Sequence, residues 1–317
     1  MNNKPRIHLY IRGYCGNQFF QYAFARHIQE KIGGELIVNY SKVIQSQGTQ
    51  FESDDLLNLF NVVPYKYESK AGWGGFIFKS LKFIHILFHL NTFSKRTYRF
   101  FLLCARILPV FGIYYFDAAY YPFKIYKRRN IYINGYFESS QYFRDIDDKL
   151  KMELTAKAPL LDHNTQLYDA ITKNESVCIT IKRMDVNNEE IADVYQYDIS
   201  YFYKAIEYIK SRLDSPVFIV FSDDVQWCKD NIHIDAKVYY ETPGNPIWEK
   251  IRLMSSCKHF IIHNSTFSWW AQHLSTNTNK IVVAPSKWMM RDDQPIDIYE
   301  EGWFYLKPNG EFSDCHE

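Results

Sequence analysis

Short apolar runs alternate with amphipathic stretches along most of the chain, a pattern that is typical of α/β proteins. The first apolar run, residues 7–11, is followed by a glycine turn at 13–16. Beyond the turn, apolar residues recur at helical spacing from Phe20 to Ile28 until a glycine pair ends the pattern, and a second apolar run follows at 36–39. This order of strand, glycine turn, helix and strand predicts the start of a Rossmann-like domain.

The same alternation resumes in the second half, after a loop around Pro159. Its pattern predicts strands at 177–181, 217–221, 238–240, 260–263 and 281–284, and helices at 199–213, 225–231, 248–256 and 266–274. Before the loop, a strand at 130–136 and a helix at 138–150 complete the first half. We therefore predict two domains, 1–158 and 159–317, because a chain of 317 residues is long enough for two cores.

The segment 71–130 differs from the rest of the chain in charge. It holds ten Lys or Arg residues and a single acidic residue, Asp117, with apolar runs between the basic positions. Such a composition is typical of helices packed beneath an acceptor-side subdomain, and also of helices that lie on an anionic membrane surface. Because Arg106 and Pro109 interrupt the longest apolar run, we expect no membrane-spanning helix, which needs about 20 apolar residues.

Composition and charge narrow the class of protein. The formal net charge is +1, so we expect neither nucleic acid nor an acidic partner. The six cysteines have no C-x-x-C or zinc-like spacing, and the N-terminus has no apolar segment behind a basic start, so we expect reduced thiols in a cytoplasmic protein. The 25 Tyr, 24 Phe and 7 Trp residues favour a carbohydrate protein, because exposed aromatic rings form platforms for sugars.

Polar clusters follow three of the predicted strands in the second half. They are T-I-K-R-M-D at 180–185, S-D-D at 222–224 and N-S-T at 264–266. In an open parallel sheet, ligands bind beyond the carboxyl ends of the strands, so we expect the three clusters to converge on one pocket. Lys182 and Arg183 supply positive charge there, which favours a nucleoside diphosphate as the ligand.

The third cluster leads into the predicted helix 266–274. Ser265 or Thr266 is expected to cap this helix, and its N-terminus, through Phe267, is a favourable place for a phosphate group. Asp223 is expected to accept a hydrogen bond from the N–H edge of the nucleotide base. Each cluster also has a plainer interpretation, as a solvated turn or an ordinary strand-to-helix junction.

One pair of acidic residues has the spacing of a metal site. Asp145 and Asp147 form the D-x-D pattern with which some sugar transferases hold a divalent cation. The pair lies in the polar entry of a helix, where acidic side chains interact favourably with the helix dipole. We therefore expect no metal and no other cofactor.

Several short motifs are spread over both halves. They are G-N-Q-F-F-Q-Y-A-F-A at 16–25, N-G-Y-F at 134–137, F-S-D-D at 221–224, L-M-S at 253–255 and N-S-T-F-S-W-W at 264–270. These motifs resemble those of the bacterial α-1,2-fucosyltransferases of glycosyltransferase family eleven. The resemblance implies a GT-B fold, in which two Rossmann-like domains face a central cleft. It also implies a GDP-sugar donor held mainly by the C-terminal domain, an acceptor on the N-terminal side, inversion at the anomeric carbon and no metal.

One segment departs from the family pattern. The family's H-x-R-R-x-D motif corresponds to residues 180–185, so Thr180 stands in place of His and Lys182 in place of the first Arg. Lysine keeps the charge but loses the bidentate contact to phosphate.

We expect Arg183, Lys182 and Asp185 to be catalytic, with Asp185 as the general base or as a partner of Arg183. The expected donor-binding residues are Gly16, Asn17, Gln18, Thr180, Ser222, Asp223, Asn264, Ser265, Thr266 and Phe267.

The resulting hypothesis is an inverting, metal-independent glycosyltransferase of surface polysaccharide biosynthesis. It moves L-fucose from GDP-fucose to a galactoside-type hydroxyl of an oligosaccharide or a lipid-linked glycan, in the cytoplasm or on the inner face of the cell membrane. Two alternatives stay open. One is the same fold with a different nucleotide-sugar donor, because of Thr180 and Lys182; the other is a sugar-binding relative that binds ligand without releasing GDP.

Overall fold

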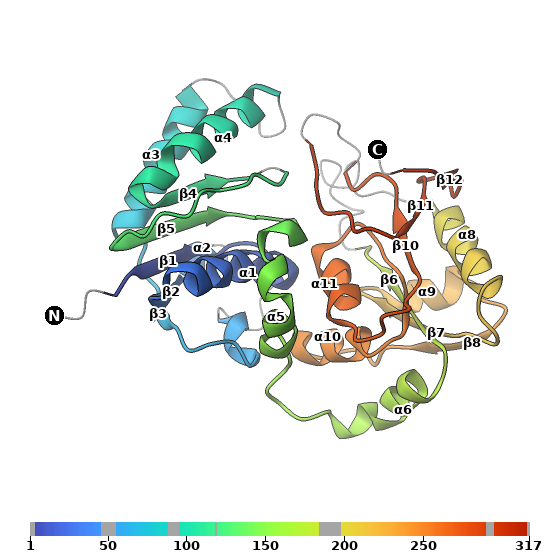
Figure 1. Cartoon of the computed structure of the whole chain (residues 1–317). Helices are drawn as coiled ribbons and strands as arrows, with labels where there is room; N and C mark the ends of the chain where they lie inside the picture. Colours follow the sequence, from blue (N-terminus) through green and yellow to red (C-terminus); the bar gives the residue numbers. More distant parts are fainter. Residues whose placement is uncertain are drawn as a thin grey trace. The chain divides into compact units, whose positions relative to one another are not determined.

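The structure, a computed structural model, describes residues 4–45, 55–87, 95–117, 119–183, 198–289 and 295–315. They form two compact domains, of which the first runs to Thr155 and includes 295–298, and the second holds the remainder. Each domain is built on its own mainly parallel sheet with helices around it (Figure 1). The chain leaves the first domain after Thr155, whereas the sequence pattern places the boundary after residue 158. Residues 295–298 belong to the first domain again, and no pattern in the sequence predicts this second passage of the chain.

The N-terminal domain contains a five-stranded parallel sheet. In spatial order its strands are β3 (Lys66–Glu68), β2 (Glu35–Asn39), β1 (Arg6–Tyr10), β5 (Asn130–Gly135) and β4 (Ile113–Phe116). Ile7 and Leu9 in β1, and Ile131 and Ile133 in β5, are fully buried, as expected for central strands of a covered parallel sheet. The strand order reverses between β1 and β5, and open α/β sheets bind ligands at the carboxyl end of such a point.

Helix α1 (Cys15–Ile32) follows β1 and buries the face that its periodicity predicts. Phe20 and Phe24 lie in the core, and the Phe24 ring stacks on Phe137, with the ring centroids 4.0 Å apart. Gly33 ends the helix with a φ of 69°, a conformation that favours glycine. Packing of this face attaches the first helix to the segment after β5.

The segment after β5 is not the single helix predicted at 138–150. The shorter elements of this domain are α2 (Ser41–Gln45), η1 (Leu56–Leu59), η3 (Ser140–Tyr142), η4 (Arg144–Ile146) and α5 (Asp147–Glu153). Phe143 has a φ of −137° and a ψ of 15°, which is outside the helical region, so the chain makes two short turns before α5 begins.

The basic segment 71–130 forms two helices, as its composition predicts, and one strand, β4, which the composition does not predict. Its elements are α3 (Gly72–Leu87), α4 (Lys95–Ile107), η2 (Leu108–Phe111) and β4. The two helices lie side by side next to β4 (Figure 1), and His85 of α3 contacts Phe101 of α4. Phe78 packs on Tyr10, which fixes α3 to the sheet. None of the helices in the described part of the chain is long and apolar enough to cross a membrane.

The C-terminal domain contains a seven-stranded sheet. In spatial order its strands are β12 (Phe312–Ser313), β11 (Phe304–Leu306), β10 (Val282–Pro285), β9 (His259–Ile261), β6 (Ser176–Ile181), β7 (Val217–Ser222) and β8 (Lys237–Tyr240). All neighbours are parallel except β11 and β12. The sequence pattern ends the sheet at residue 284, because β11 and β12 are too short to give an apolar periodicity. The strand order reverses between β6 and β9.

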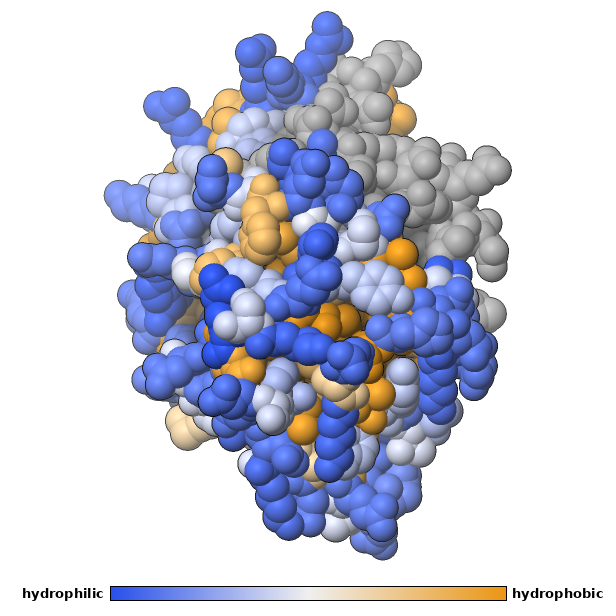
Figure 2. All heavy atoms as spheres, turned by 90° about the vertical axis from the view of Figure 1, so that its right-hand side faces the viewer, coloured by the Kyte–Doolittle hydropathy of each residue, from blue (hydrophilic) through white to orange (hydrophobic). Residues whose placement is uncertain are grey.

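Helices cover this sheet and complete its core. They are η5 (Asp162–Asn164), α6 (Thr165–Lys173), α8 (Ile199–Lys210), α9 (Val225–Asn231), α10 (Ile247–Ser255) and α11 (Thr266–Leu274). The α8 residue Tyr201 is fully buried, and its hydroxyl donates to the Ile262 carbonyl at 2.7 Å. Hydrophilic residues cover most of the face of the molecule in Figure 2 and surround a smaller central group of hydrophobic ones.

Candidate functional site

The three polar clusters of the C-terminal domain lie at neighbouring strand ends. Strand β6 pairs with β7 on one side and with β9 on the other, all in parallel, and Ile181 is level with Ser222. The clusters that follow these strands therefore emerge at the same edge of the sheet, at the point where the strand order reverses.

Thr180 joins two of these strand ends. Its side chain is buried, and Oγ1 accepts a hydrogen bond of 3.0 Å from the backbone N–H of His263. Burial, with a smaller contribution from the charge of Lys182, lowers the pKa of His263 to about 3. The His263 ring is therefore neutral at physiological pH, and Lys182 is close enough to act on it electrostatically.

Arg183 and Asp223 join the other pair of strand ends. The Arg183 backbone N–H donates to Oδ1 of Asp223 at 2.7 Å, and the Arg183 guanidinium carbon lies 3.7 Å from the centroid of the Trp227 ring. The guanidinium Nε is buried and has no hydrogen-bond partner among the described residues. Stacking on an aromatic ring fixes the orientation of a guanidinium without using its N–H donors, so those donors stay available to an anion.

Ser222 and its neighbours hold the end of β7 in place. The Ser222 N–H donates to the buried carboxylate of Glu241 at 2.8 Å, and the Ser222 hydroxyl accepts from the Asp224 N–H at 3.0 Å. Asp224 in turn caps α9, because its carboxylate accepts from the Trp227 N–H at 3.0 Å. Burial raises the pKa of Glu241, and Lys250, 3.2 Å away, opposes that rise. The Ser222 side chain thus shapes the turn.

The N-cap residue of α11 provides no side-chain cap. Ser265 occupies this position with an extended backbone, but its side chain makes no capping hydrogen bond, so the predicted capping by Ser265 is wrong. The Ser265 backbone N–H donates to the His263 carbonyl at 2.7 Å. Thr266 and Phe267 are half-buried, which leaves the first turn accessible. An accessible helix N-terminus favours an anionic ligand, because its first N–H groups have no partner within the helix.

Asn264 lies buried beside that helix end. Its Nδ2 donates to the Trp288 carbonyl at 3.0 Å, and its Oδ1 is buried with no hydrogen-bond partner among the described residues. Trp269 and Trp270, which follow in the same motif, are fully buried and belong to the core. An orphaned buried acceptor carries a free-energy cost, and such groups concentrate where a ligand completes the structure.

The glycine turn of the N-terminal domain is shaped by its own side chains. Gly13 has a φ of 73°, and a Cβ there would lie 2.6 Å from Nδ2 of Asn17. Gln18 is fully buried and its Nε2 donates to the Gly13 carbonyl at 3.0 Å. The Gln18 Oε1 is buried and has no hydrogen-bond partner among the described residues, so the ligand-facing role of Gln18 stays a prediction. Asn17 is half-buried at the turn, and Gly16 is buried in the first turn of α1.

Charged residues that the motifs did not identify gather at the carboxyl edge of the N-terminal sheet. Arg12 follows β1 and pairs with Asp117, which follows β4. Its guanidinium carbon lies 4.1 Å from the Tyr136 ring centroid, and the Tyr136 N–H donates to Asp117 at 2.9 Å. Burial, then the nearby Asp117 charge, raises the pKa of Glu138 to about 7, although Arg12 opposes the rise. The only signal in the sequence is that Glu138 directly follows N-G-Y-F.

Two further predictions concern residues outside this arrangement. Asp185, the predicted general base, lies outside the described residues. Asp145 pairs with Lys31, and Asp147 pairs with Lys151 at 2.8 Å, so the D-x-D residues serve in ion pairs. Within the described ranges, no three His, Cys, Asp or Glu side chains gather in a way that could hold a metal ion.

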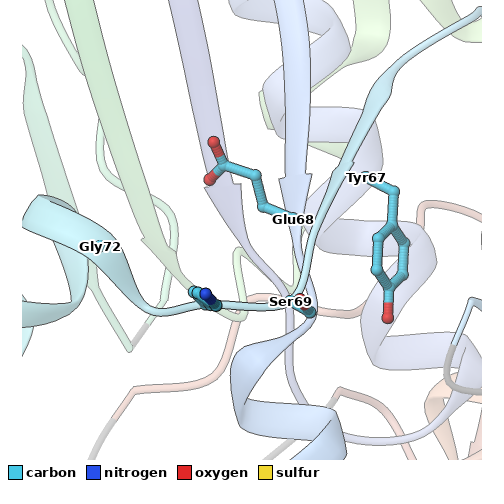
Figure 3. Close-up of a pocket in the computed structure, with 5 residues that line it drawn as sticks. Tyr67, Glu68, Ser69 and Gly72 are labelled. Carbon is cyan, nitrogen blue, oxygen red and sulfur yellow. The ribbon is translucent and has the colours of Figure 1, made fainter.

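An open pocket of about 380 Å³ lies at the end of β3 and contains none of the predicted site residues. Its lining residues are Tyr67, Glu68, Ser69, Lys70 and Gly72. Tyr67 and Glu68 leave the strand on opposite sides (Figure 3), as neighbouring strand residues do, so their polar groups do not converge. Strand β2 separates β3 from β1, and the pocket is therefore away from the point where the strand order reverses.

Comparison with solved structures identifies the fold. The structure matches a crystal structure of the fucosyltransferase NodZ from Bradyrhizobium with a TM-score of 0.50 and 11% sequence identity, over 85% of this chain and 91% of that one. With its two parallel-sheet α/β domains, the chain has the GT-B fold of glycosyltransferases.

Comparison of sequences identifies the family. The model of Glycosyl transferase family 11 matches residues 79–307, well over half of the chain, and the chain belongs to this family. An Escherichia coli protein named alpha-1,2-colitosyltransferase is 28% identical over 94% of this chain and 97% of its own length. The O-antigen biosynthesis glycosyltransferase WbnK of Escherichia coli is 28% identical over 93% of this chain and 99% of its own length. The protein is an enzyme, a fucosyltransferase-like glycosyltransferase.

Proposed function

We propose that the protein transfers L-fucose from GDP-fucose to a galactoside-type hydroxyl in surface polysaccharide biosynthesis, with inversion at the anomeric carbon and without a metal. The observation that carries the proposal is the arrangement at the ends of β6, β7 and β9. There the Arg183 backbone is bound to Asp223, and Ser265 leaves the accessible N-terminus of α11 without a hydrogen bond from its own side chain. Family membership and the name of the WbnK relative support the reaction class and the polysaccharide role.

The arrangement supplies what a departing nucleoside diphosphate requires. As the bond from the anomeric carbon to the β-phosphate oxygen breaks, negative charge accumulates on GDP. Lys182 and Arg183 offer cations at the same sheet edge as the amides of the α11 first turn, and such charges stabilise the transition state where another enzyme would use a metal ion. Addition of a chelator should therefore leave turnover unchanged.

A second donor is supported by a specific observation. One relative is named as a colitosyltransferase, and Lys182 stands where the family motif has an arginine. Colitose differs from fucose by the absence of one ring hydroxyl. A site that hydrogen-bonds that hydroxyl discriminates strongly, by up to about 10⁴–10⁵, whereas an apolar pocket does not.

A thermal-shift series tests the donor. The protein is heated with GDP, GDP-fucose, GDP-colitose, GDP-mannose or a UDP-sugar, since a ligand that binds only the folded state raises the melting temperature. We expect the largest rise with GDP-fucose and none with the UDP-sugar. A larger rise with GDP-colitose supports the second donor, and a rise with the UDP-sugar alone contradicts both.

We also propose that the helices α3 and α4 rest on an anionic membrane surface, where a lipid-linked acceptor would be found. Trp73, Phe76 and Phe83 lie on one side of α3 and are 68%, 61% and 64% exposed. Lys79 and Lys82 flank them and are also exposed. An apolar strip bordered by lysines suits the interface between headgroups and acyl chains, and each basic residue near such a surface contributes about 1 kcal/mol.

Vesicle sedimentation distinguishes this surface from a merely exposed helix. The protein should sediment with vesicles of phosphatidylcholine and phosphatidylglycerol, and less with phosphatidylcholine alone. The double variant Phe76→Ser and Phe83→Ser should lose most of this binding. Phe312→Ser, which removes a phenylalanine that is 59% exposed in the other domain, is the matched control. Equal binding by the double variant and the control would contradict the proposal and favour the acceptor-side role of these helices.

A further inference from the structure

Glu138 occupies an unusual position for a carboxylate. It lies just after β5, at the carboxyl edge of the N-terminal sheet and beside the point where the strand order reverses between β1 and β5. Its side chain is half-buried, and among the residues that the structure describes none forms a hydrogen bond or an ion pair with its carboxylate. Buried or partly buried charges are normally paired, so an unpaired one at a sheet edge indicates a functional role.

The groups around Glu138 come from each neighbouring strand end. Asp117, after β4, and Arg12, after β1, form an ion pair with each other and are the charged groups that act on Glu138. Tyr136 precedes Glu138 and binds that pair through its ring and its backbone N–H. With Arg12 engaged by Asp117, Glu138 lacks a cation of its own, and the pKa of about 7 follows from burial beside a like charge. A general base works best with a pKa near the working pH.

We propose that Glu138 is the general base of the transfer reaction, an inference that rests on the proposed function. Its carboxylate accepts the proton of the acceptor hydroxyl while the hydroxyl oxygen forms a bond to the anomeric carbon. The bond from that carbon to the β-phosphate oxygen breaks, and GDP leaves with the electron pair. Arg12 and Asp117 act as positioning residues, because their ion pair fixes the end of β5 and keeps Arg12 from neutralising Glu138.

The other carboxylates at the described strand ends are already engaged. Asp117 pairs with Arg12, Asp223 accepts from the Arg183 N–H, and Asp224 caps α9. Glu138 is therefore the carboxylate whose oxygen atoms are left for a substrate hydroxyl. Asp185, the base predicted from the sequence, is the competing assignment.

The test compares Glu138→Gln, Asp185→Asn and Glu68→Gln with the unmodified protein. Glu68 is a matched control, because it is another half-buried carboxylate at the end of a strand of the same sheet. We expect Glu138→Gln to lower the transfer rate by about 10²–10⁴ and to leave GDP affinity unchanged. The fall in kcat/KM below about pH 7 should be lost in Glu138→Gln and kept in Glu68→Gln.

The outcomes separate the inference from the function on which it rests. Absence of transfer by the unmodified protein overturns both. Transfer that survives in Glu138→Gln, or that keeps its pH profile there, overturns only the role of Glu138. If the fall in kcat/KM at low pH is lost in Asp185→Asn but kept in Glu138→Gln, the general base is Asp185. A lowered GDP affinity in Glu138→Gln indicates a structural effect and also contradicts the proposal.

Discussion

The backbone N–H of Arg183 donates a hydrogen bond of 2.7 Å to Oδ1 of Asp223, and this bond joins the ends of β6 and β7. It holds the segment that carries the candidate cations against the turn that leads to α9. The Arg183 side chain is held separately, by stacking 3.7 Å from the Trp227 ring centroid on α9 itself. Both the backbone and the guanidinium of Arg183 are thus fixed before any ligand binds, which is the preorganisation that electrostatic catalysis requires.

Removal of the Asp223 carboxylate tests the role of this bond. Asp223→Ala should lower GDP affinity about tenfold, because a hydrogen bond to a charged group contributes about 1.5–3 kcal/mol and the Arg183 segment loses its anchor. Asp224→Ala is the matched control, since Asp224 caps α9 instead. It should lower the free energy of unfolding by about 1 kcal/mol and leave GDP affinity unchanged. Calorimetric titration with GDP and urea denaturation measure the two effects, and equal GDP affinities would contradict the assignment.

Removal of the Arg183 guanidinium tests the charge at the same edge. Arg183→Ala should lower turnover by about 10²–10³, the usual loss for one donor that stabilises developing charge. Arg212→Ala is a close control, because Arg212 also stacks on an aromatic ring, 3.5 Å from the Tyr208 centroid, in the same domain. We expect unchanged turnover in Arg212→Ala. Comparable losses in the two variants would show that arginine stacking stabilises the domain in general.

The two glycines that bound the first helix allow a test of the turn. Gly13 and Gly33 have φ angles of 73° and 69°, so alanine at either should cost about 1–2 kcal/mol of stability. A Cβ at Gly13 would displace the Asn17 side chain, whereas a Cβ at Gly33 would meet nothing within 4 Å. We therefore expect only Gly13→Ala to lose transfer activity as well. Equal activity in the two variants would remove Asn17 from the predicted site.

The buried His263 predicts a pH dependence of stability. Its folded-state pKa of about 3 lies below the usual 6.5, so the unfolded chain binds a proton that the folded chain does not. This contribution to stability is fully present above pH 6.5 and is lost as the pH falls from there towards 3. His263→Gln should have a lower free energy of unfolding at pH 8 and a smaller decrease between pH 8 and pH 5. Urea denaturation at both values measures this, and identical decreases would contradict the assigned pKa.

The sequence alone predicts the elements that have strong periodicity. The buried face of α1 and the neighbouring ends of β6, β7 and β9 follow from local patterns of apolar and polar residues. The short strands β11 and β12 carry no such pattern. The helix predicted at 138–150 is wrong because the backbone of Phe143 leaves the helical region.

Candidate site residues could be predicted from the sequence where they belong to a motif. They could not be predicted where their properties depend on contacts between distant parts of the chain. The residues at 180–183 and 264–267 are proposed as site residues from sequence motifs alone. Gln18 is predicted from its motif position, and its hydrogen bond to the Gly13 carbonyl could not be predicted from that motif. Glu138 acquires its properties from Arg12 and Asp117, which are remote from it in sequence and reach it only through the pairing of β1, β5 and β4.

The measurement that tests the central claim most directly is GDP release from GDP-fucose in the presence of a panel of galactosides, with the product linkage read by nuclear magnetic resonance. We predict release that depends on the galactoside, is insensitive to a chelator, and yields an α-1,2-linked fucosyl product. Binding of GDP-fucose without galactoside-dependent release of GDP, under any acceptor in the panel, would contradict the account and identify the protein as a sugar-binding relative that has lost catalysis.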